Sequence, residues 1–535
     1  MKKIFLFLLL VLIIIIVSFL FYTRSVLGEL TVFTPYAKNL LGFDEGKKYL
    51  LIFQNNNELR PSGGFISAYG ILNLNNGKFN LDFADSYSLT EIENLLPAPE
   101  PFNILLEDDS KFQGWYFRDA NFAPDFRRAA QDIEKLFWQQ AGLKKEQFDG
   151  IFAINFEFLE NLVEIYDLNV GGIKINKANL FSVLEHEVKN IDTHDVEELK
   201  NRKNILGDLS KEIIYEATHS PLKYRDLFRQ ISAAFNQKQI LLNFKNNDLQ
   251  EIAEIKGWAG KLYPADYDNF IHSNITNIGG RKADRYVKKR HEYFLSFNNS
   301  GRGIVRYSLS MEHFGTYNLN SDIYNAYIRV FIPTEAEYLE EYLEIKPGES
   351  KEISFQYLLP EDIKKENFNL DLIKQSGTND FWEVTIQLPT DYSLISEEFE
   401  TRENLSFWSG ALVADKHFDF EFLKDITPPL VVWQKLQEPN LIEINFSEAL
   451  DEDIALDPGN YKIEDLNYIN DQTDTIEVEK IYFKNSTIYL KTRGLSSANE
   501  ERYKLTLTGL QDKAGNKTKP EELEITVVQR LLTKS

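Results

Sequence analysis

The stretch FQNNNELRPSGGF, residues 53–65, joins two apolar runs at 49–53 and 65–72. Both runs are short and rich in aromatic and β-branched residues, which predicts two buried strands. The polar side chains, the proline and the Gly-Gly pair between them predict a tight connection. Glu58 and Arg60 are therefore expected where two core strands end. They form either a solvated ion pair on a hairpin turn or, because glycines let a ligand approach the backbone closely, part of a binding site.

The composition excludes several classes of function. The chain has 535 residues, of which 43% are hydrophobic and 13% aromatic, enough for more than one folded domain. Its net charge of −23 argues against a general nucleic-acid binder, because phosphate contacts need clustered Lys and Arg. Cysteine is absent, which excludes thiol catalysis, disulfides, zinc–thiolate sites and iron–sulfur clusters.

The first residues have the pattern of a membrane anchor. Lys2 and Lys3 precede an uncharged apolar run at 4–22, and a helix of this length spans roughly 28 Å, close to the hydrocarbon thickness of a bilayer. No convincing cleavage site follows, so an uncleaved anchor is expected rather than a signal peptide. The positive-inside rule then places the chain beyond Arg24 outside the cytoplasm. The sequence predicts a single-pass plasma-membrane protein whose partner at 4–22 is the lipid bilayer.

Periodicity and turn signals divide the chain into five parts. Alternating strand-like and helix-like patterns predict a mixed α/β domain, and recurring strand patterns between turn clusters predict an antiparallel β-sandwich. The Thr-Pro-Pro tripeptide at 427–429 marks the last boundary. The predicted parts are a cytoplasmic tip and anchor at 1–22, a juxtamembrane stalk at 23–45, the α/β domain at 46–286, the sandwich at 287–424 and a second small β-domain at 427–530.

Arginines gather near predicted strand ends in this acidic chain. They are Arg60, Arg118, Arg127, Arg128 and Arg202. Guanidinium groups that converge on one cleft would bind phosphate or carboxylate in a bidentate manner, whereas scattered surface ion pairs are the alternative. The chain has no G-x-S-x-G elbow, P-loop or dinucleotide fingerprint.

Two acidic segments contain residue types that can bind a metal ion. The Glu and His residues at 185–195 lack the HExxH spacing, and a solvated helix is expected there. The acidic residues at 451–457 lack the glycine and spacing of an EF-hand loop, although they could donate oxygens to extracellular calcium. No metal site is predicted from these residues.

Several motifs between about 45 and 290 resemble known families. FDGIFAINF at 148–156, with the Gly-Gly-Ile strand start at 171–173, resembles the core of the LytR–CpsA–Psr domain. The chain resembles more closely a bacterial family of unknown function that is distantly similar to those proteins. The motifs that carry this second resemblance are NELRPSGGF at 57–65, NFAPD at 121–125 and NITNIGGRKAD at 274–284.

The resemblance implies a membrane-anchored extracytoplasmic domain. In the LytR–CpsA–Psr group, arginines and Mg²⁺ hold a polyprenyl-pyrophosphate glycopolymer that is transferred to the cell wall. Arg60 matches the first arginine of that group's Arg-x-Asp-Thr motif, and Arg202 lies where a later helix supplies another. Ser62 stands at the aspartate of the motif and Asp85-Ser86 where an Arg-Asp pair is expected. These departures remove groups on which the Mg²⁺ site and the transfer step depend, and no catalytic residue is assigned.

The candidate ligand-binding residues follow from the arginines and these motifs. They are Glu58, Arg60, Ser62, Gly63, Gly64, Arg118, Asp119, Asp125, Arg127 and Arg202.

The C-terminal segment resembles a bacterial immunoglobulin-like domain. The motifs are TPP at 427–429, INFSEALD at 444–451, NY at 460–461 and DKAGN at 512–516. Such domains are usually spacers or adhesion modules. Two functions remain open: binding or transfer of a pyrophosphate-linked envelope glycopolymer, or a non-catalytic surface scaffold or adhesin whose LytR-like domain has lost its chemistry.

Overall fold

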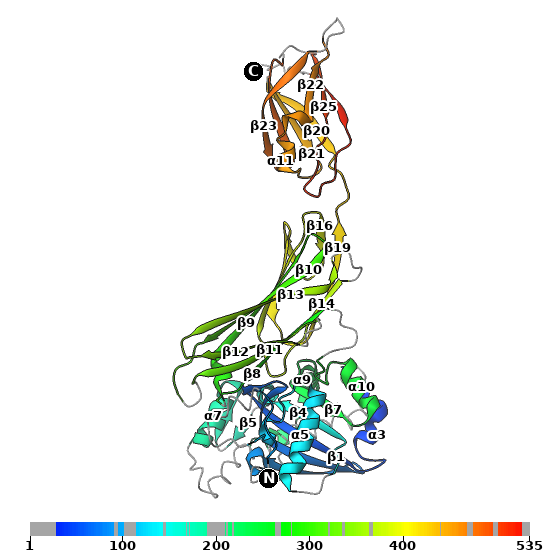
Figure 1. Cartoon of the computed structure of the whole chain (residues 1–535). Helices are drawn as coiled ribbons and strands as arrows, with labels where there is room; N and C mark the ends of the chain where they lie inside the picture. Colours follow the sequence, from blue (N-terminus) through cyan, green and yellow to red (C-terminus); the bar gives the residue numbers. More distant parts are fainter. Residues whose placement is uncertain are drawn as a thin grey trace.

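The chain is mostly β and its strands form three bodies in a row (Figure 1). In this computed structural model the first body lies before residue 263, the sandwich covers 269–425 and the C-terminal body covers 431–526. The described residues are 28–89, 95–100, 114–142, 146–166, 168–170, 172–189, 209, 212–213, 215–216, 219–262, 269–279, 281–318, 322–333, 338–362, 368–438, 440–467, 474–495 and 501–526.

The first body has a five-stranded sheet in the order β3-β2-β1-β4-β7. Its strands are β3 (Lys78–Asp85), β2 (Gly63–Asn75), β1 (Lys47–Arg60), β4 (Gly150–Asn155) and β7 (Ile240–Phe244). A small antiparallel pair, β5 (Leu168–Val170) and β6 (Ile173–Ile175), accompanies it. Its helices include η1 (Gly28–Tyr36), α3 (Ala37–Leu40), η2 (Ser86–Leu89), η3 (Phe117–Asp119), α5 (Phe126–Ala141), α6 (Phe156–Ile165), α7 (Lys177–Lys189), η4 (Pro221–Lys223), α9 (Tyr224–Asn236) and α10 (Asn247–Ile255).

Both faces of this sheet are covered, because successive strand side chains point to opposite faces. Leu50 and Ile52 of β1 pack with α5, whereas Tyr49 and Leu51 pack with α6, α9 and α10. Part of the predicted stalk region, in η1 and α3, is described by the structure. Its apolar side chains pack into the same core as Tyr49 and Leu51. Burial on both faces explains why these strands read as continuous apolar runs.

The sandwich consists of two six-stranded sheets. One has the order β13-β10-β9-β15-β18-β17, with bounds Ser350–Asp362, Arg302–His313, Val287–Phe297, Phe381–Gln387, Leu405–Ala411 and Glu400–Arg402. The other has the order β12-β11-β8-β14-β19-β16, with bounds Leu339–Ile345, Tyr324–Phe331, Phe270–Asn277, Phe368–Leu372, Lys416–Lys424 and Tyr392–Ile395. The short helix η5 (Ala283–Tyr286) connects β8 to β9, so the sandwich takes in a strand that precedes residue 287.

The C-terminal body is one seven-stranded sheet in the order β20-β21-β24-β23-β22-β25-β26. The bounds are Val431–Glu438, Leu441–Phe446, Thr487–Arg493, Thr475–Lys484, Tyr461–Asp465, Arg502–Leu507 and Glu521–Thr526. Two short helices, α11 (Glu452–Ala455) and η6 (Pro458–Asn460), lie before β22. The edge strands β20 and β26 approach each other, so the sheet curls into a near-barrel around its own core.

The predicted fold class is wrong, because its α/β LytR-like domain and its immunoglobulin-like domain do not match the mostly β structure. An α/β domain is built on a mostly parallel sheet with helical crossovers. In the first sheet only β1 and β4 pair in parallel, and the other pairs are antiparallel. An immunoglobulin domain needs two packed sheets, whereas the C-terminal strands form one continuous sheet. Apolar runs predicted strands correctly but could not specify how the strands pair.

No helix within the described residues is long and apolar enough to cross a membrane. The predicted anchor at 4–22 lies outside the described residues.

Candidate functional site

The hairpin end formed by β1 and β2 lies against the sandwich. Leu59 pairs with Gly64 and Arg60 with Gly63, so Pro61 and Ser62 make the turn. A Cβ atom on Gly64 would lie 2.3 Å from the Asn55 carbonyl oxygen, and one on Gly63, where φ is +136°, would lie 2.1 Å from Gln54 Oε1. Glycine is therefore required here because protein groups approach the backbone closely. These close approaches account for both glycines without a ligand.

Arg60 is buried at the base of this turn, with 2% of its surface exposed. Its Nε and Nη2 donate to Asp119 Oδ1 at 3.0 and 2.9 Å, and Nη2 also donates to Glu58 Oε1 at 3.1 Å. Its Nη1 donates to the carbonyl oxygens of Leu59 at 3.2 Å and Asn277 at 2.6 Å. A guanidinium group has five N–H donors, and these five bonds match them in number. The geometry makes Arg60 a buried structural centre and leaves it no donor for a phosphate.

The two carboxylates beside Arg60 are buried as well. Burial raises the pKa of Glu58, and the Arg60 charge offsets only part of that effect. Burial alone would lower the pKa of Arg60, yet Asp119 and Glu58 together raise it. The arginine is therefore fixed in its charged form, and the cluster depends on all three side chains.

The other predicted site residues fall into two groups. Arg118 adjoins the cluster, with Nε 3.8 Å from Asp119 Oδ2 and its guanidinium over the rings of Tyr116 and Tyr87. Arg127 lies apart on α5, where it is exposed and pairs with Glu254.

Asp125 is the N-cap of α5 and accepts from the backbone N–H groups of Arg128 and Leu262. Ser62 Oγ donates to the Asn121 carbonyl oxygen. Arg202 lies outside the described residues. The predicted convergence on one cleft therefore reduces, among the described residues, to Glu58, Arg60, Arg118 and Asp119.

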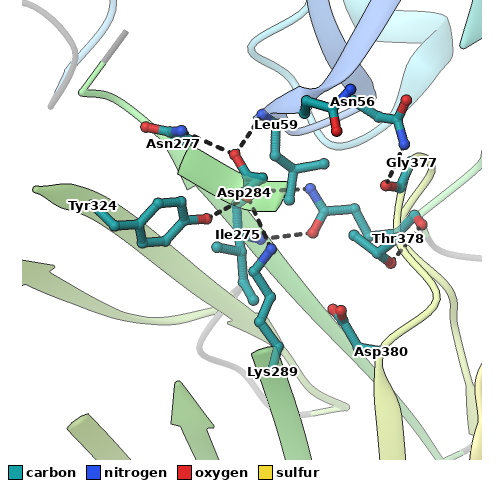
Figure 2. Close-up of polar contacts among 12 residues, drawn as sticks. Asn56, Leu59, Ile275, Asn277, Asp284, Lys289, Tyr324, Gly377, Thr378 and Asp380 are labelled. Carbon is teal, nitrogen blue, oxygen red and sulfur yellow. Dashed lines mark hydrogen bonds and ion pairs between the residues drawn. The ribbon is translucent and has the colours of Figure 1, made fainter. Parts of the chain in front are cut away.

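Asp284 connects the hairpin end to the sandwich (Figure 2). Its Oδ2 accepts from the Leu59 backbone N–H at 2.8 Å and from Asn277 Nδ2 at 2.9 Å. Its Oδ1 accepts from Lys289 Nζ at 2.9 Å and from the Tyr324 hydroxyl at 2.6 Å. Asp284 and Lys289 are both buried, with 5% of each side chain exposed. One carboxylate thus accepts a hydrogen bond from Leu59 of the first body and bonds from three side chains of the sandwich.

Buried amides add further bonds across the same junction. Gln375 Nε2 donates to the Arg60 carbonyl oxygen, and Asn274 Nδ2 donates to the Pro61 carbonyl oxygen. Gln375 also bonds both the N–H and the carbonyl of Ile275. Leu59 itself lies in the hydrophobic core of the sandwich. The first body and the sandwich therefore share apolar and polar packing at this junction.

Arg329 of β11 marks a second crossing point. It is buried, donates to the Phe122 carbonyl oxygen at 3.1 Å and lies over the Phe122 ring. Phe122 in turn stacks on Tyr327 with an interplanar angle of 3°. The NFAPD motif, in which Asp125 is a predicted site residue, thus supplies a contact with the sandwich.

Sequence reasoning missed Asp284 and Lys289 as members of the site. The signal was present in the NITNIGGRKAD motif, which contains Asn274, Asn277 and Asp284. The motif lies at the end of the predicted α/β domain, and local spacing does not show which distant segment a polar side chain will contact.

Two of the acidic residues considered for calcium, Asp451 and Asp457, serve as helix caps. Asp451 accepts from the Ile454 N–H and Asp457 from the Gly459 N–H. Carboxylate oxygens of Asp425, Glu448 and Asp512 instead lie within 4.8 Å of one another, next to the linker. Asp512 accepts there from the backbone and side chain of Asn516, which also donates to the Asp425 carbonyl oxygen.

One comparison with known protein families gives a match for part of this chain. Residues 44–188 match the model of a protein family of unknown function (DUF4012). The predicted resemblance to a family of unknown function is thus confirmed for that segment, which is less than half of the chain, and no link to LytR–CpsA–Psr proteins is shown. No curated protein matches the chain.

Solved structures show only a weak likeness. The N-terminal part of the bacterial S-layer protein SbsC matches at 16% identity with a TM-score of 0.17, over 19% of this chain and 24% of that one. Domains 1–6 of the surface layer protein SbsC match at 17% identity with a TM-score of 0.18, over 20% of this chain and 14% of that one. The chain spans a quarter or less of these proteins, and TM-scores this low define neither fold nor function.

Proposed function

We propose that this protein is a non-catalytic scaffold whose first body and sandwich form a rigid base for the C-terminal body. The observation that carries the proposal is the closed state of Arg60, whose five N–H donors are matched by five bonds to protein groups. A phosphate clamp needs guanidinium donors that face a ligand. In this proposal Arg60 is part of the structural junction and does not act as a phosphate clamp.

The junction suits a rigid scaffold, because its bonds come from separate segments of the sandwich. Asp284 bonds Leu59, and Gln375 and Asn274 bond the turn carbonyls. Buried hydrogen bonds between groups of the two bodies favour one arrangement of the packed parts. A scaffold that sets a fixed distance benefits from such a joint.

A position outside the cytoplasm belongs to this proposal and rests on the sequence alone. The absence of cysteine and the order of charges around residues 4–22 support it. The partner of the C-terminal body would then be another envelope component. An adhesin fits the same proposal, because it would use the rigid base to present its C-terminal body to such a partner.

The rival function, transfer of a pyrophosphate-linked glycopolymer, is tested by turnover. The full chain, incubated with a short polyprenyl pyrophosphate and Mg²⁺, should release no monophosphate or pyrophosphate product above a protein-free blank, because no described arginine of the cluster is free to hold the leaving group. The assay is phosphorus NMR of the reaction mixture. Mg²⁺-dependent turnover that Arg118→Ala abolishes, in a variant that remains folded by circular dichroism, would overturn the scaffold proposal.

A further inference from the structure

Three aromatic side chains lie on the outer face of the C-terminal body. They belong to three of the four neighbouring strands β20, β21, β24 and β23. Side chains of a strand alternate between the two faces of its sheet, and Ile444 and Ile488 of these strands point into the core. Trp433 on β20, Tyr489 on β24 and Tyr482 on β23 point the other way, and Trp433 and Tyr482 are 37% and 43% exposed.

The pairing of the strands places the three rings on one surface. Tyr482 lies opposite Tyr489, Tyr489 opposite Glu443, and Glu443 opposite Lys435. Directly opposite residues share a face. Lys435 Nζ lies 4.7 Å from the centre of the Trp433 ring, so Trp433 shares it too. Because β20 and β23 are three strand spacings apart, the rings extend about 14 Å across the sheet.

Polar side chains lie between the rings. Asn445 is opposite both Trp433 and Thr487, and its Nδ2 donates to the Thr487 hydroxyl at 2.9 Å. Lys435 Nζ pairs with Glu443 Oε2 at 2.9 Å. The surface therefore offers flat apolar rings bordered by hydrogen-bonding groups. We call it the aromatic face, and its residues are Trp433, Lys435, Glu443, Asn445, Tyr482, Thr487 and Tyr489.

The aromatic face carries a local surplus of positive charge, although the whole chain has a net charge of −23. The described side chains of the four strands include five basic residues and three acidic ones. Two of each are paired, Lys435 with Glu443 and Arg493 with Glu479. Three exposed lysines form no ion pair with another described residue; they are Lys480, Lys484 and Lys491. The surface is thus complementary in charge to an anionic partner.

We propose that the aromatic face binds an acidic polysaccharide, with pyranose rings stacked on Trp433, Tyr489 and Tyr482. The C–H face of a pyranose packs flat on an aromatic ring, whose negative face attracts it. The sugar hydroxyls would bond to Asn445 and Thr487, and the acidic groups would lie near the lysines. A nucleic acid fits less well, because the acidic residues among the lysines would repel its closely spaced phosphates.

This inference deepens the proposed function and rests on it for the position of the C-terminal body outside the cytoplasm. The body lies at the end of the row away from the first body (Figure 1). The rigid base would then present the aromatic face to an envelope polysaccharide. Binding and rigidity are measured separately, so either can fail while the other stands.

The test is titration calorimetry of the full chain with polygalacturonate, an acidic polymer of pyranose rings. Trp433→Ala and Tyr482→Ala should each weaken binding by about tenfold, as expected when a ring at the centre of an interface is removed. The control Tyr317→Ala removes a ring of the sandwich that is 64% exposed, and it should bind like the wild type. Circular dichroism checks that each variant folds, and Tyr482→Ala decides the result if Trp433→Ala does not fold.

Charge is tested with other polymers and with lysine variants. Neutral dextran should bind at least tenfold more weakly than polygalacturonate, and Lys480→Gln with Lys491→Gln should lower the affinity severalfold and weaken its salt dependence. Polyglutamate and oligothymidylate supply negative charge without pyranose rings. Equal binding of either polymer or of dextran would overturn the proposal. So would the absence of polygalacturonate binding, or an equal loss of affinity in Tyr317→Ala.

Discussion

Arg60→Met should destabilise the protein by roughly 3–5 kcal/mol, the loss typical when one partner of a buried ion pair is removed. The substitution leaves Glu58 and Asp119 buried without their cation, and it deletes the bond to the Asn277 carbonyl oxygen across the junction. The measurement is urea unfolding of the full chain, followed by tryptophan fluorescence. A ligand clamp would give the opposite result, because an arginine held open for a phosphate contributes little to stability.

Two controls isolate the cause. Arg127→Met removes an exposed arginine that pairs with Glu254, and it should cost no more than about 1 kcal/mol. Neutralising the two carboxylates together with the arginine, in Arg60→Met with Glu58→Gln and Asp119→Asn, should recover much of the lost stability, since no buried charge is then left unpaired. If Arg60→Met unfolds at the same urea concentration as Arg127→Met, the structural role assigned to Arg60 is wrong.

Asp284→Ala should have an effect of similar size, about 3–5 kcal/mol. It leaves Lys289 buried without the carboxylate that now raises its pKa against the effect of burial. It also frees the Leu59 N–H, the bond by which Asp284 holds the first body. We therefore expect both a lower unfolding midpoint and separate unfolding of the first body and the sandwich, measured by scanning calorimetry.

The matched control for this substitution is Asp419→Ala. Asp419 lies on β19 of the same sandwich with 80% of its side chain exposed, and its removal should change stability by about 0.5 kcal/mol or less. A single cooperative transition in Asp284→Ala, at the wild-type midpoint, would show that the junction does not depend on this carboxylate.

The hairpin of β1 and β2 could be predicted from its sequence, but not its full length. Apolar runs placed strands at 49–53 and 65–72, whereas β1 continues to Arg60 and β2 begins at Gly63. The polar residues between them predict a tight connection, because a local pattern does not show distant partners. Arg60 bonds Asn277, which is 217 residues away, and Leu59 bonds Asp284, which is 225 residues away. No local pattern specifies such contacts.

For the candidate site, the sequence identified the residues but not their burial. Glu58 and Arg60 are predicted where two strands end, and the structure brings them together with Asp119, another candidate site residue. Their burial, which converts a clamp into a structural centre, depends on the sandwich that covers them.

The central claim, that the first body and the sandwich form one rigid base, is tested most directly by a distance distribution between spin labels. The chain has no cysteine, so Glu251→Cys on α10 and Glu352→Cys on β13 create two unique exposed labelling sites. Pulsed electron paramagnetic resonance on the doubly labelled full chain should give a single narrow distance peak, no wider than that of two labels placed within the sandwich at Glu352→Cys and Asp419→Cys. A broad or two-peaked distribution between the bodies, with a narrow peak inside the sandwich, would contradict the claim.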